Sequence, residues 1–168
     1  MDLLIEPGVE RDAAALAKLR AEVAEGLTRR NGKGHWSHAG TEAGVLRDIR
    51  TSTVLVARRG DQALGMLRLA TRKPWAIAVE YFTPVRRPLY LLDLAVSSAE
   101  QGSGIGSSLL LEAVRVATAW PSDAIRLDAY DGPAGAGGFY AKHGFREVGK
   151  VVYRGTPLVY FERLLSGR

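Results

Sequence analysis

The stretch Leu94–Leu110, LAVSSAEQGSGIGSSLL, decides the fold of this 168-residue chain. It joins the end of an apolar run, Leu89–Val96, to a glycine-rich turn, Gln101–Gly106. The apolar run predicts a central strand that is buried on both faces. From Ile105, apolar residues recur at helical spacing and predict a helix to about Ala119, beyond which a proline stops it. The segment therefore consists of a strand, a turn and a helix.

A glycine-rich turn between a strand and a helix can bind an anion. Glycine adopts positive φ and lets the backbone approach a bulky ligand, while the first amides of a helix lack partners and lie at its positive end. Three alternating glycines and two serines exceed what a turn alone needs, so we expect a pyrophosphate cradle rather than a ligand-free turn. Both familiar phosphate motifs fail, because no lysine follows the glycines and Ser107 replaces the third glycine of the dinucleotide fingerprint.

The rest of the chain contains both helical and strand patterns. Further strands are predicted at Met1–Glu6, Thr53–Ala57, Ala63–Ala70, Ala124–Tyr130, Phe145–Tyr153 and Leu158–Leu165, and further helices at about Arg11–Glu25, after Thr41 and at about Ala136–His143. Thr28–Gly40 reads as a loop, and Trp75–Tyr81 as an extended or added strand. Strands and helices mix without strict alternation, which is typical of a mixed sheet covered by helices, an α/β or α+β fold.

Composition narrows the class of protein. Hydrophobic residues make up 46% and charged residues 24%, which favours one globular domain over residues 1–168. Cysteine is absent, which excludes disulfides, thiolate metal sites and a cysteine nucleophile. No apolar run approaches the roughly 20 residues of a membrane span, and the first residues lack a signal peptide's pattern, so we expect a cytoplasmic protein. The net charge of +5 comes from scattered basic pairs, so neither nucleic acid nor a membrane is expected as a partner.

Two motifs resemble the Gcn5-related N-acetyltransferase (GNAT) superfamily. Gln101, Gly104 and Gly106 match its acetyl-CoA signature Q/R-x-x-G-x-G/A. Phe139–Phe145, FYAKHGF, resembles the family's FY-x-K-x-GF segment. The resemblance implies a GNAT-like central mixed β-sheet with splayed parallel strands, flanked by about four helices. One departure is Pro133, which stands where many members have asparagine, so a side-chain contact to the pantetheine arm is lost or is made by backbone.

The resemblance implies an N-acetyltransferase that moves an acetyl group from acetyl-CoA to a primary amine. Acetyl-CoA would lie between Leu89–Val96 and Ala124–Tyr130, and a backbone N–H near Leu94–Val96 would stabilise the oxyanion. Tyr140 would protonate the leaving thiolate, with a packed aromatic ring as the alternative. The cofactor-binding residues so implied are Leu94, Ala95, Val96, Gln101, Gly102, Ser103, Gly104, Ile105, Gly106, Ser107, Phe139 and Lys142.

Two carboxylates are candidates for the base that deprotonates the amine. Asp93 interrupts an apolar run, where a charge is costly without a polar cavity or a partner, so it is either a base or a structural ion pair. Glu80, near the expected end of the preceding strand, is the second candidate or a solvated charge. A water relay is the third alternative.

The acceptor side is less specified. Trp36 and Tyr81 are the candidate substrate-binding residues, with surface packing as the alternative. His35 and His38 have helical spacing but no evident third ligand, so no metal is expected. A small-molecule amine is favoured as acceptor. A protein or peptide amine and a non-catalytic acyl-CoA-binding module remain as alternatives, and a homodimer stays open.

Overall fold

The computed structural model describes residues 1–165, which divide into two compact units. The first unit comprises Met1–Ala70 and Leu92–Ala113, and the second comprises Thr71–Leu91 and the chain from Val114 onward. The first unit contains β1 (Leu3–Pro7), η1 (Glu10–Asp12), α1 (Ala13–Asn31), η2 (His35–Ser37), α2 (Glu42–Thr51), β2 (Thr53–Arg59), β3 (Gln62–Ala70) and η4 (Ser98–Glu100). The second contains η3 (Val79–Tyr81), β5 (Ala124–Tyr130), α4 (Gly137–Lys142), β6 (Arg146–Tyr153) and β7 (Thr156–Leu164). Two elements belong partly to each unit, β4 (Pro88–Val96) and α3 (Ile105–Ala119).

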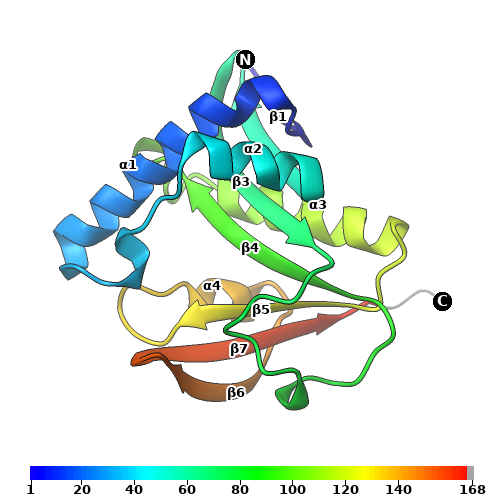
Figure 1. Ribbon diagram of the computed structural model, residues 1–168. Coiled ribbons are helices and arrows are strands. Elements are labelled where there is room, and N and C mark those ends of the chain that lie inside the picture. Colours follow the sequence, from blue (N-terminus) through cyan, green and yellow to red (C-terminus); the bar gives the residue numbers. More distant parts are fainter. Residues whose placement is uncertain (166–168) are drawn as a thin grey trace. The chain divides into compact units, whose positions relative to one another are not determined.

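The strands form one mixed sheet in the order β1-β2-β3-β4-β5-β7-β6 (Figure 1). Pro88–Tyr90 of β4 pairs in parallel with Ala124–Arg126 of β5. The pairs β1–β2, β2–β3, β5–β7 and β6–β7 are antiparallel. The expected mixed sheet with four α-helices is confirmed for the described residues.

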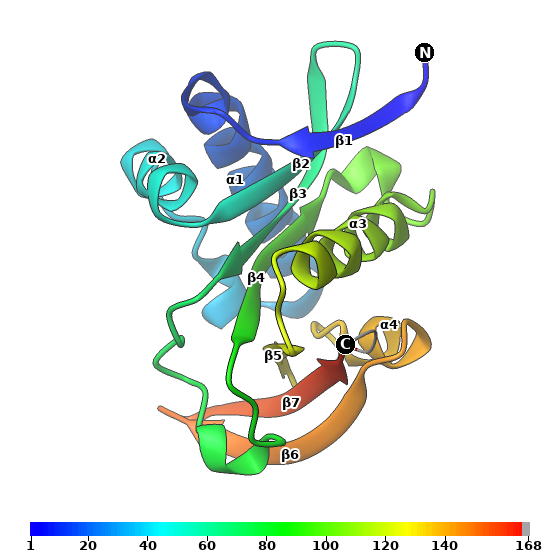
Figure 2. The same ribbon diagram turned by 90° about the vertical axis from the view of Figure 1, so that its right-hand side faces the viewer.

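In the first unit, helices cover both faces of the β2–β3 hairpin. Figure 2 shows α1 and α2 on one side and α3 on the other. Leu16 of α1 and Val45 of α2 are buried against the hairpin with Val56 and Met66. On the α3 side, a Cβ at Gly65 would lie only 3.0 Å from Leu109 Cδ1, so glycine at this position favours close packing of the helix.

Helix α1 is longer than its apolar spacing predicts. It continues past Glu25 to Asn31, so the expected loop begins only at Gly32, which ends the helix with φ of 80°. Local contacts hold the added residues 26–31. Thr28 Oγ1 donates to the carbonyl of Ala24 at 2.8 Å, and Arg29 pairs with Glu25 at 3.1 Å.

The prediction of a strand at Trp75–Tyr81 is wrong. The segment makes turns and ends in the short helix η3. Backbone groups of this segment form hydrogen bonds with side chains rather than with a neighbouring strand. Tyr160 Oη accepts from Ala78 N at 3.1 Å and donates to Ala76 O. Lys73 Nζ also donates to Ile77 O at 2.7 Å.

The prediction that β4 is buried on both faces holds for only part of the strand. Leu89–Leu91 are buried, whereas Leu92–Leu94 are only half-buried. The change coincides with Asp93, whose charge needs polar partners. In contrast, α3 and β5 have the bounds that the sequence predicts, and Gly144 follows α4 with φ of 81°.

Candidate active site

The turn Gln101–Gly104 is exposed and leads directly into α3. Gly102 and Gly104 have φ of 83° and 91°, a left-handed conformation that side chains disfavour. Apart from the adjoining residues of the chain, no heavy atom lies within 4 Å of the Cβ that either glycine would carry. Conformation rather than crowding therefore requires glycine here, and the space beside the backbone is open, as an anion cradle needs.

Hydrogen bonds tie this turn to the end of β4. The Gln101 side chain donates from Nε2 to the carbonyl of Val96 at 3.2 Å. Ser103 N donates to Glu100 O at 3.2 Å, and Ser103 Oγ donates to the same carbonyl. Glu100 in turn pairs with Arg59 at 3.0 Å. These contacts fix the turn before a ligand binds, so binding would cost less conformational entropy.

The carboxyl-terminal part of β4 carries three expected cofactor-binding residues. Ala95 is buried, while Leu94 and Val96 are half-buried. Just before them, Asp93 has φ of 58°. Aspartate adopts this left-handed conformation more readily than most non-glycine residues do, but the conformation breaks the regular alternation of the strand. The regular conformation of β4 is therefore interrupted immediately before Leu94.

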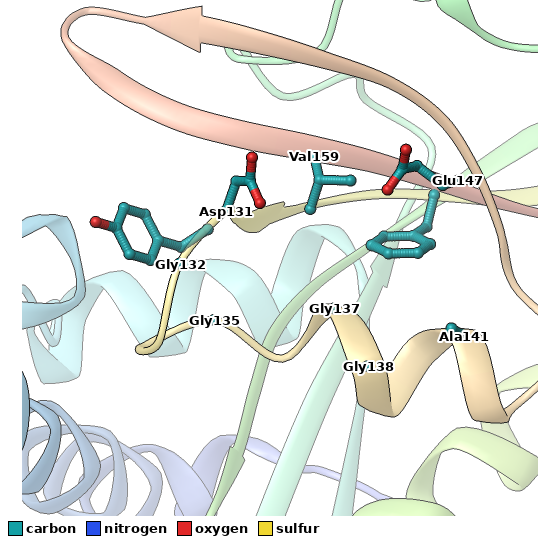
Figure 3. A pocket seen from close by; sticks show the side chains of 10 residues that line it. Asp131, Gly132, Gly135, Gly137, Gly138, Ala141, Glu147 and Val159 are labelled. Carbon is teal, nitrogen blue, oxygen red and sulfur yellow. The ribbon is translucent and has the colours of Figure 1, made fainter.

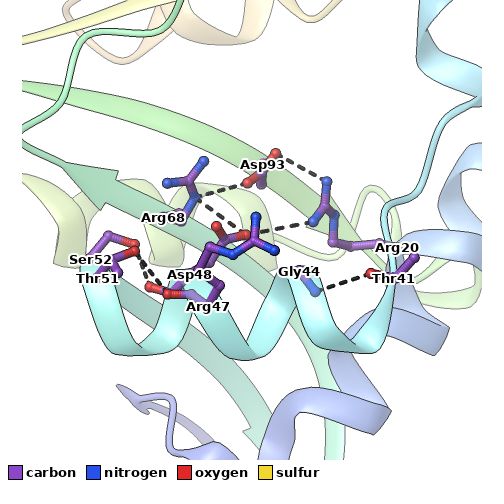
Figure 4. A network of polar contacts seen from close by, with 9 residues as sticks. All are labelled: Arg20, Thr41, Gly44, Arg47, Asp48, Thr51, Ser52, Arg68 and Asp93. Atoms are coloured by element: carbon purple, nitrogen blue, oxygen red, sulfur yellow. Dashed lines mark hydrogen bonds and ion pairs between the residues drawn. The ribbon is translucent and has the colours of Figure 1, made fainter.

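Asp93 lies in a cluster of charged side chains from four elements (Figure 4). Its Oδ1 accepts from Arg20 Nη2 at 3.2 Å, and its Oδ2 accepts from Arg68 Nε at 3.0 Å. Asp48 of α2 lies farther away, with Oδ2 at 3.8 Å from Arg68 Nε and 4.0 Å from Arg20 Nη1. Burial raises the pKa of Asp48, against the attraction of the arginines. Of the two expected alternatives for Asp93, the structure shows the ion pair directly.

Tyr140 lies in α4 of the second unit and is 6% exposed. Its ring packs against Phe145 and Phe161, with centroids 5.8 and 6.1 Å away. Burial raises the pKa of its hydroxyl far above the usual range, and the charge of Asp128 adds to this effect. Burial likewise raises the pKa of Asp128. Tyr140 is therefore both packed and protonated at neutral pH, the form that a general acid needs.

The other two expected residues of α4 differ in environment. Phe139 is half-buried, and its ring lies 5.4 Å from that of Tyr140 and 4.5 Å from that of His143. Lys142 is exposed at the end of the helix. The helix thus has one aromatic packing face and one face open to solvent.

Two of the pockets in the described part of the chain lie in the second unit. One, of about 400 Å³, is lined by Asp131, Gly132, Glu147, Val159 and Phe161 among others. Figure 3 shows the two carboxylates on either side of Val159. The other, of about 440 Å³, is lined by Trp75, Ile77, Glu80, Tyr81, Val152 and Tyr160 among others.

The second pocket brings together two residues that the sequence singled out for different reasons. Glu80 lies in η3 rather than at a strand end, because the expected strand does not form. It lines the same pocket as Tyr81. The Tyr81 ring meets that of Tyr160 edge-on at 5.5 Å, and a Cβ at Gly149 would lie 2.3 Å from it. Aromatic rings around one carboxylate suit a cationic group.

Trp36 lies in the first unit, in η2 of the connection between α1 and α2. It is half-buried, and its Nε1 donates to the carbonyl of Gly32 at 2.9 Å. Its ring also meets that of His35 edge-on at 5.5 Å.

Within residues 1–165, no three histidine or acidic side chains are grouped to hold a metal, and no helix is long and apolar enough to cross a bilayer.

Comparison with known families decides the identity of the fold. A family model described as an acetyltransferase (GNAT) domain matches residues 50–147. The chain belongs to the GNAT acetyltransferase family. The match includes the glycine turn, β4, Tyr140 and Asp93. No curated protein sequence matches significantly.

Solved GNAT structures share the fold over nearly the whole chain. The putative acetyltransferase yncA of Salmonella typhimurium, solved with acetyl-CoA, has a TM-score of 0.75 and 15% identity, covering 100% of this chain and 96% of that one. An aminoglycoside 6'-acetyltransferase type Ii has a TM-score of 0.73 and 15% identity, with coverage of 98% and 99%. The ribosomal-protein-alanine N-acetyltransferase of Brucella melitensis has a TM-score of 0.72 and 22% identity, with coverage of 96% and 99%. Identities this low show a common GNAT fold only.

Sequence reasoning missed the partners of Asp93. Arg68 interrupts an apolar run of β3 as Asp93 interrupts that of β4. Two opposite charges, each alone in an apolar strand, are a signal that the strands bring them together. Arg20 carries no comparable signal, because a basic residue on an amphipathic helix is ordinary. Asp128, beside Tyr140, was likewise missed.

Proposed function

We propose that the chain, acting as one acetyltransferase domain over residues 1–168, transfers an acetyl group from acetyl-CoA to a primary amine. The observation that carries this proposal is the open, left-handed turn Gln101–Gly104 at the start of α3, in a chain of the GNAT family. The turn fits a pyrophosphate, because backbone amides and the positive end of a 15-residue helix meet beside open space. The acetyl-CoA bound to yncA supports the choice of cofactor.

The proposed cofactor-binding residues follow from these positions. Amides of Gly102–Ser107 would bind the pyrophosphate, and the backbone of Leu94–Val96 would pair with the pantetheine. Phe139 and Lys142 of α4 would contact the pantetheine. When bound, acetyl-CoA supplies a thioester carbonyl for the amine to attack. A backbone N–H near Leu94–Val96 would stabilise the negative charge that develops on the carbonyl oxygen.

Tyr140 is the proposed general acid. Its raised pKa keeps the hydroxyl protonated until a thiolate forms. A thiolate in an equally buried place is itself a stronger base, because the same desolvation raises the pKa of its thiol. The proton would therefore pass from the phenol to the departing sulfur.

Glu80 or a water molecule is the proposed acceptor of the amine proton. Asp93 fits this role less well, because protonation would give up its ion pairs to Arg20 and Arg68. Glu80 is exposed and lines the aromatic pocket of the second unit.

A small-molecule amine with a cationic group is the proposed acceptor. The volume of the Glu80–Tyr81 pocket, about 440 Å³, lies in the range of small-molecule sites, roughly 300–1,000 Å³. Trp36 is kept as a further proposed contact to the acceptor. Since related folds are named for an aminoglycoside and for a ribosomal protein, a protein amine remains the second candidate.

The test is thiol release from acetyl-CoA across a panel of amines, with melting temperature measured on the same preparation. The panel contains an aminoglycoside, a polyamine, an amino acid and a peptide with amino-terminal alanine. Acetyl-CoA should raise the melting temperature more than ATP or NAD does, because a ligand that binds only the folded state stabilises it.

The results separate the candidates. Release with a small amine supports the proposal, and release with the peptide alone moves the acceptor to proteins. Binding without release assigns a non-catalytic acyl-CoA-binding module. Equal stabilisation by acetyl-CoA, ATP and NAD contradicts the proposed cofactor.

A further inference from the structure

Asp93 has a left-handed backbone conformation, with φ of 58°, in the interior of a strand. Among the described residues, the other non-glycine residue with positive φ is Arg154, in the turn between β6 and β7. A turn accommodates such a residue, whereas in a strand it disrupts the alternation of side chains between the faces. A conformation of this kind persists only where surrounding contacts hold it.

Two arginines from separate elements hold Asp93. Arg20 of α1 binds Oδ1 at 3.2 Å, and Arg68 of β3 binds Oδ2 at 3.0 Å. The three side chains are 18–21% exposed, so water screens these ion pairs only in part. We call Arg20, Arg68 and Asp93 the Asp93 clamp (Figure 4).

Asp48 completes the charge balance around the clamp. It faces both arginines at 3.8–4.0 Å, so two acidic and two basic groups share the site. Loss of the Asp93 carboxylate would leave two guanidinium groups with one longer-range partner. The clamp therefore joins the backbone of β4 to α1 and β3 by contacts that the remaining groups cannot replace.

The segment after Asp93 is held at its other end as well. Ser97 N donates to Leu64 O of β3 at 2.8 Å, and Gln101 Nε2 donates to Val96 O. The peptide groups of Leu94–Val96 thus lie between two fixed points. A change of φ at Asp93 must rotate them.

We infer that Asp93 is a positioning residue for acetyl transfer, whose clamp fixes the left-handed bend of β4 and so aims the peptide groups of Leu94–Val96. The inference rests on the proposed function, which assigns these peptide groups to the pantetheine and the thioester oxygen. Asp93 acts through its backbone, and the proton of the amine goes elsewhere.

The test compares Asp93→Asn, Asp93→Gly and Asp93→Ala. Asparagine and glycine both adopt the left-handed conformation, whereas alanine disfavours it. Asp93→Asn should keep the Kd for CoA near the wild-type value, and Asp93→Gly, which adopts the bend but lacks the clamp, should raise it about threefold. Asp93→Ala should raise it about tenfold, a change equivalent to about 1.4 kcal/mol, and should lower kcat as well.

A general base at position 93 would behave differently. All three variants would then lose turnover alike, by about 10²-fold or more, and the acid limb of the kcat/KM profile would disappear. Positioning predicts the order Asn, Gly, Ala in decreasing kcat and leaves that limb in place. Equal losses with an altered pH profile would overturn the inference.

A second ion pair of the first unit supplies the structural control. Asp12 is bound by Arg58 Nη2 at 3.0 Å, and its side chain is 10% exposed. Asp12→Asn should lower the melting temperature and leave the Kd for CoA unchanged. If Asp93→Ala also changes only the melting temperature, the clamp is merely structural and the inference fails.

Arg68→Gln tests the same idea without touching β4. This variant removes the ion pair between Arg68 and Asp93 and should raise the Kd for CoA about threefold. It also provides a test if Asp93→Ala does not fold. An unchanged Kd in Arg68→Gln overturns the inference. A wild-type protein that binds no CoA overturns the proposed function and the inference with it, whereas normal wild-type binding with unaffected variants overturns the inference alone.

Discussion

The glycine turn of the first unit and the Tyr140 helix of the second are opposite environments. At Gly102 and Gly104 the backbone is exposed, left-handed and without near neighbours. Tyr140 is buried among aromatic rings, and its hydroxyl is held protonated. An open backbone binds an anion equally before and during a reaction, whereas a buried acid acts on a charge that exists only in the transition state. Changes at the turn should therefore alter binding, and changes at Tyr140 should alter turnover.

The largest expected effect is on turnover, in Tyr140→Phe. The variant keeps the ring and its packing but removes the proton that the thiolate needs, so kcat should fall about 10²-fold or more. The Kd for CoA should stay within a few-fold, because the turn is untouched. Steady-state kinetics and titration calorimetry on one preparation measure both quantities.

Tyr90→Phe is the matched control, since Tyr90 is 3% exposed in the same unit and its hydroxyl accepts from Arg126 Nη1 at 3.2 Å. It should lose stability and keep its turnover. A near-normal kcat in Tyr140→Phe, with chemistry limiting the rate, would remove Tyr140 from the mechanism.

The next effect is on binding, in Gly104→Val. A β-branched side chain at φ of 91° strains the turn and occupies the open space, so the Kd for CoA should rise at least about tenfold. Gly155 in the β6–β7 turn has φ of 80° and equally open surroundings. Gly155→Val should therefore show similar strain with normal CoA binding. If CoA raised the melting temperatures of the two variants equally, the turn would not be part of the cofactor-binding site.

A smaller effect concerns the acceptor. Glu80→Gln removes the carboxylate of the aromatic pocket and should raise KM for a cationic amine about threefold to tenfold, the range of a partly exposed charge contact. A fall in kcat as well would show that Glu80 rather than water accepts the amine proton. The Kd for CoA should not change. Glu147→Gln, in the other pocket of the second unit, is the comparison. An increase in Glu147→Gln alone would move the acceptor to that pocket.

The smallest effect is on stability and depends on pH. Because the pKa of Asp128 is raised by burial, the folded state binds its proton more tightly than the unfolded state does. Wild type therefore loses stability as pH rises from about 4 through the folded pKa. Asp128→Asn avoids this loss and should melt about 2 °C higher at pH 7.

Thermal scans at several pH values check this prediction, since the gain should vanish below about pH 4. Asp131→Asn changes an exposed carboxylate that pairs with Lys150 and should give no such gain. A gain in Asp128→Asn that persists at low pH would rule out the charge as its cause.

The sequence predicts those parts of the site whose conformation depends on residue type. Glycine spacing marks the turn because left-handed backbone favours glycine, and Gly102 and Gly104 adopt it. The bounds of α3 follow from its apolar spacing and from Pro121. These features are local, so a short stretch of sequence contains the whole signal.

Features that depend on distant partners were not predictable in the same way. Asp93 is left-handed within a strand, and its carboxylate pairs with Arg20 and Arg68 from other elements. Trp75–Tyr81 lacks a strand because Tyr160 takes up its backbone groups. Each reason involves residues far away along the chain, which periodicity cannot reveal.

The most direct test of the central claim is a mass balance of the transfer. The protein is incubated with acetyl-CoA that carries an isotope-labelled acetyl group and with an amine accepted in the panel, and free thiol and labelled acetyl-amine are measured together. The account predicts equal amounts of both, formed at a rate that Tyr140→Phe lowers about 10²-fold. Thiol release without labelled acetyl-amine, or the same rate in Tyr140→Phe, would contradict it.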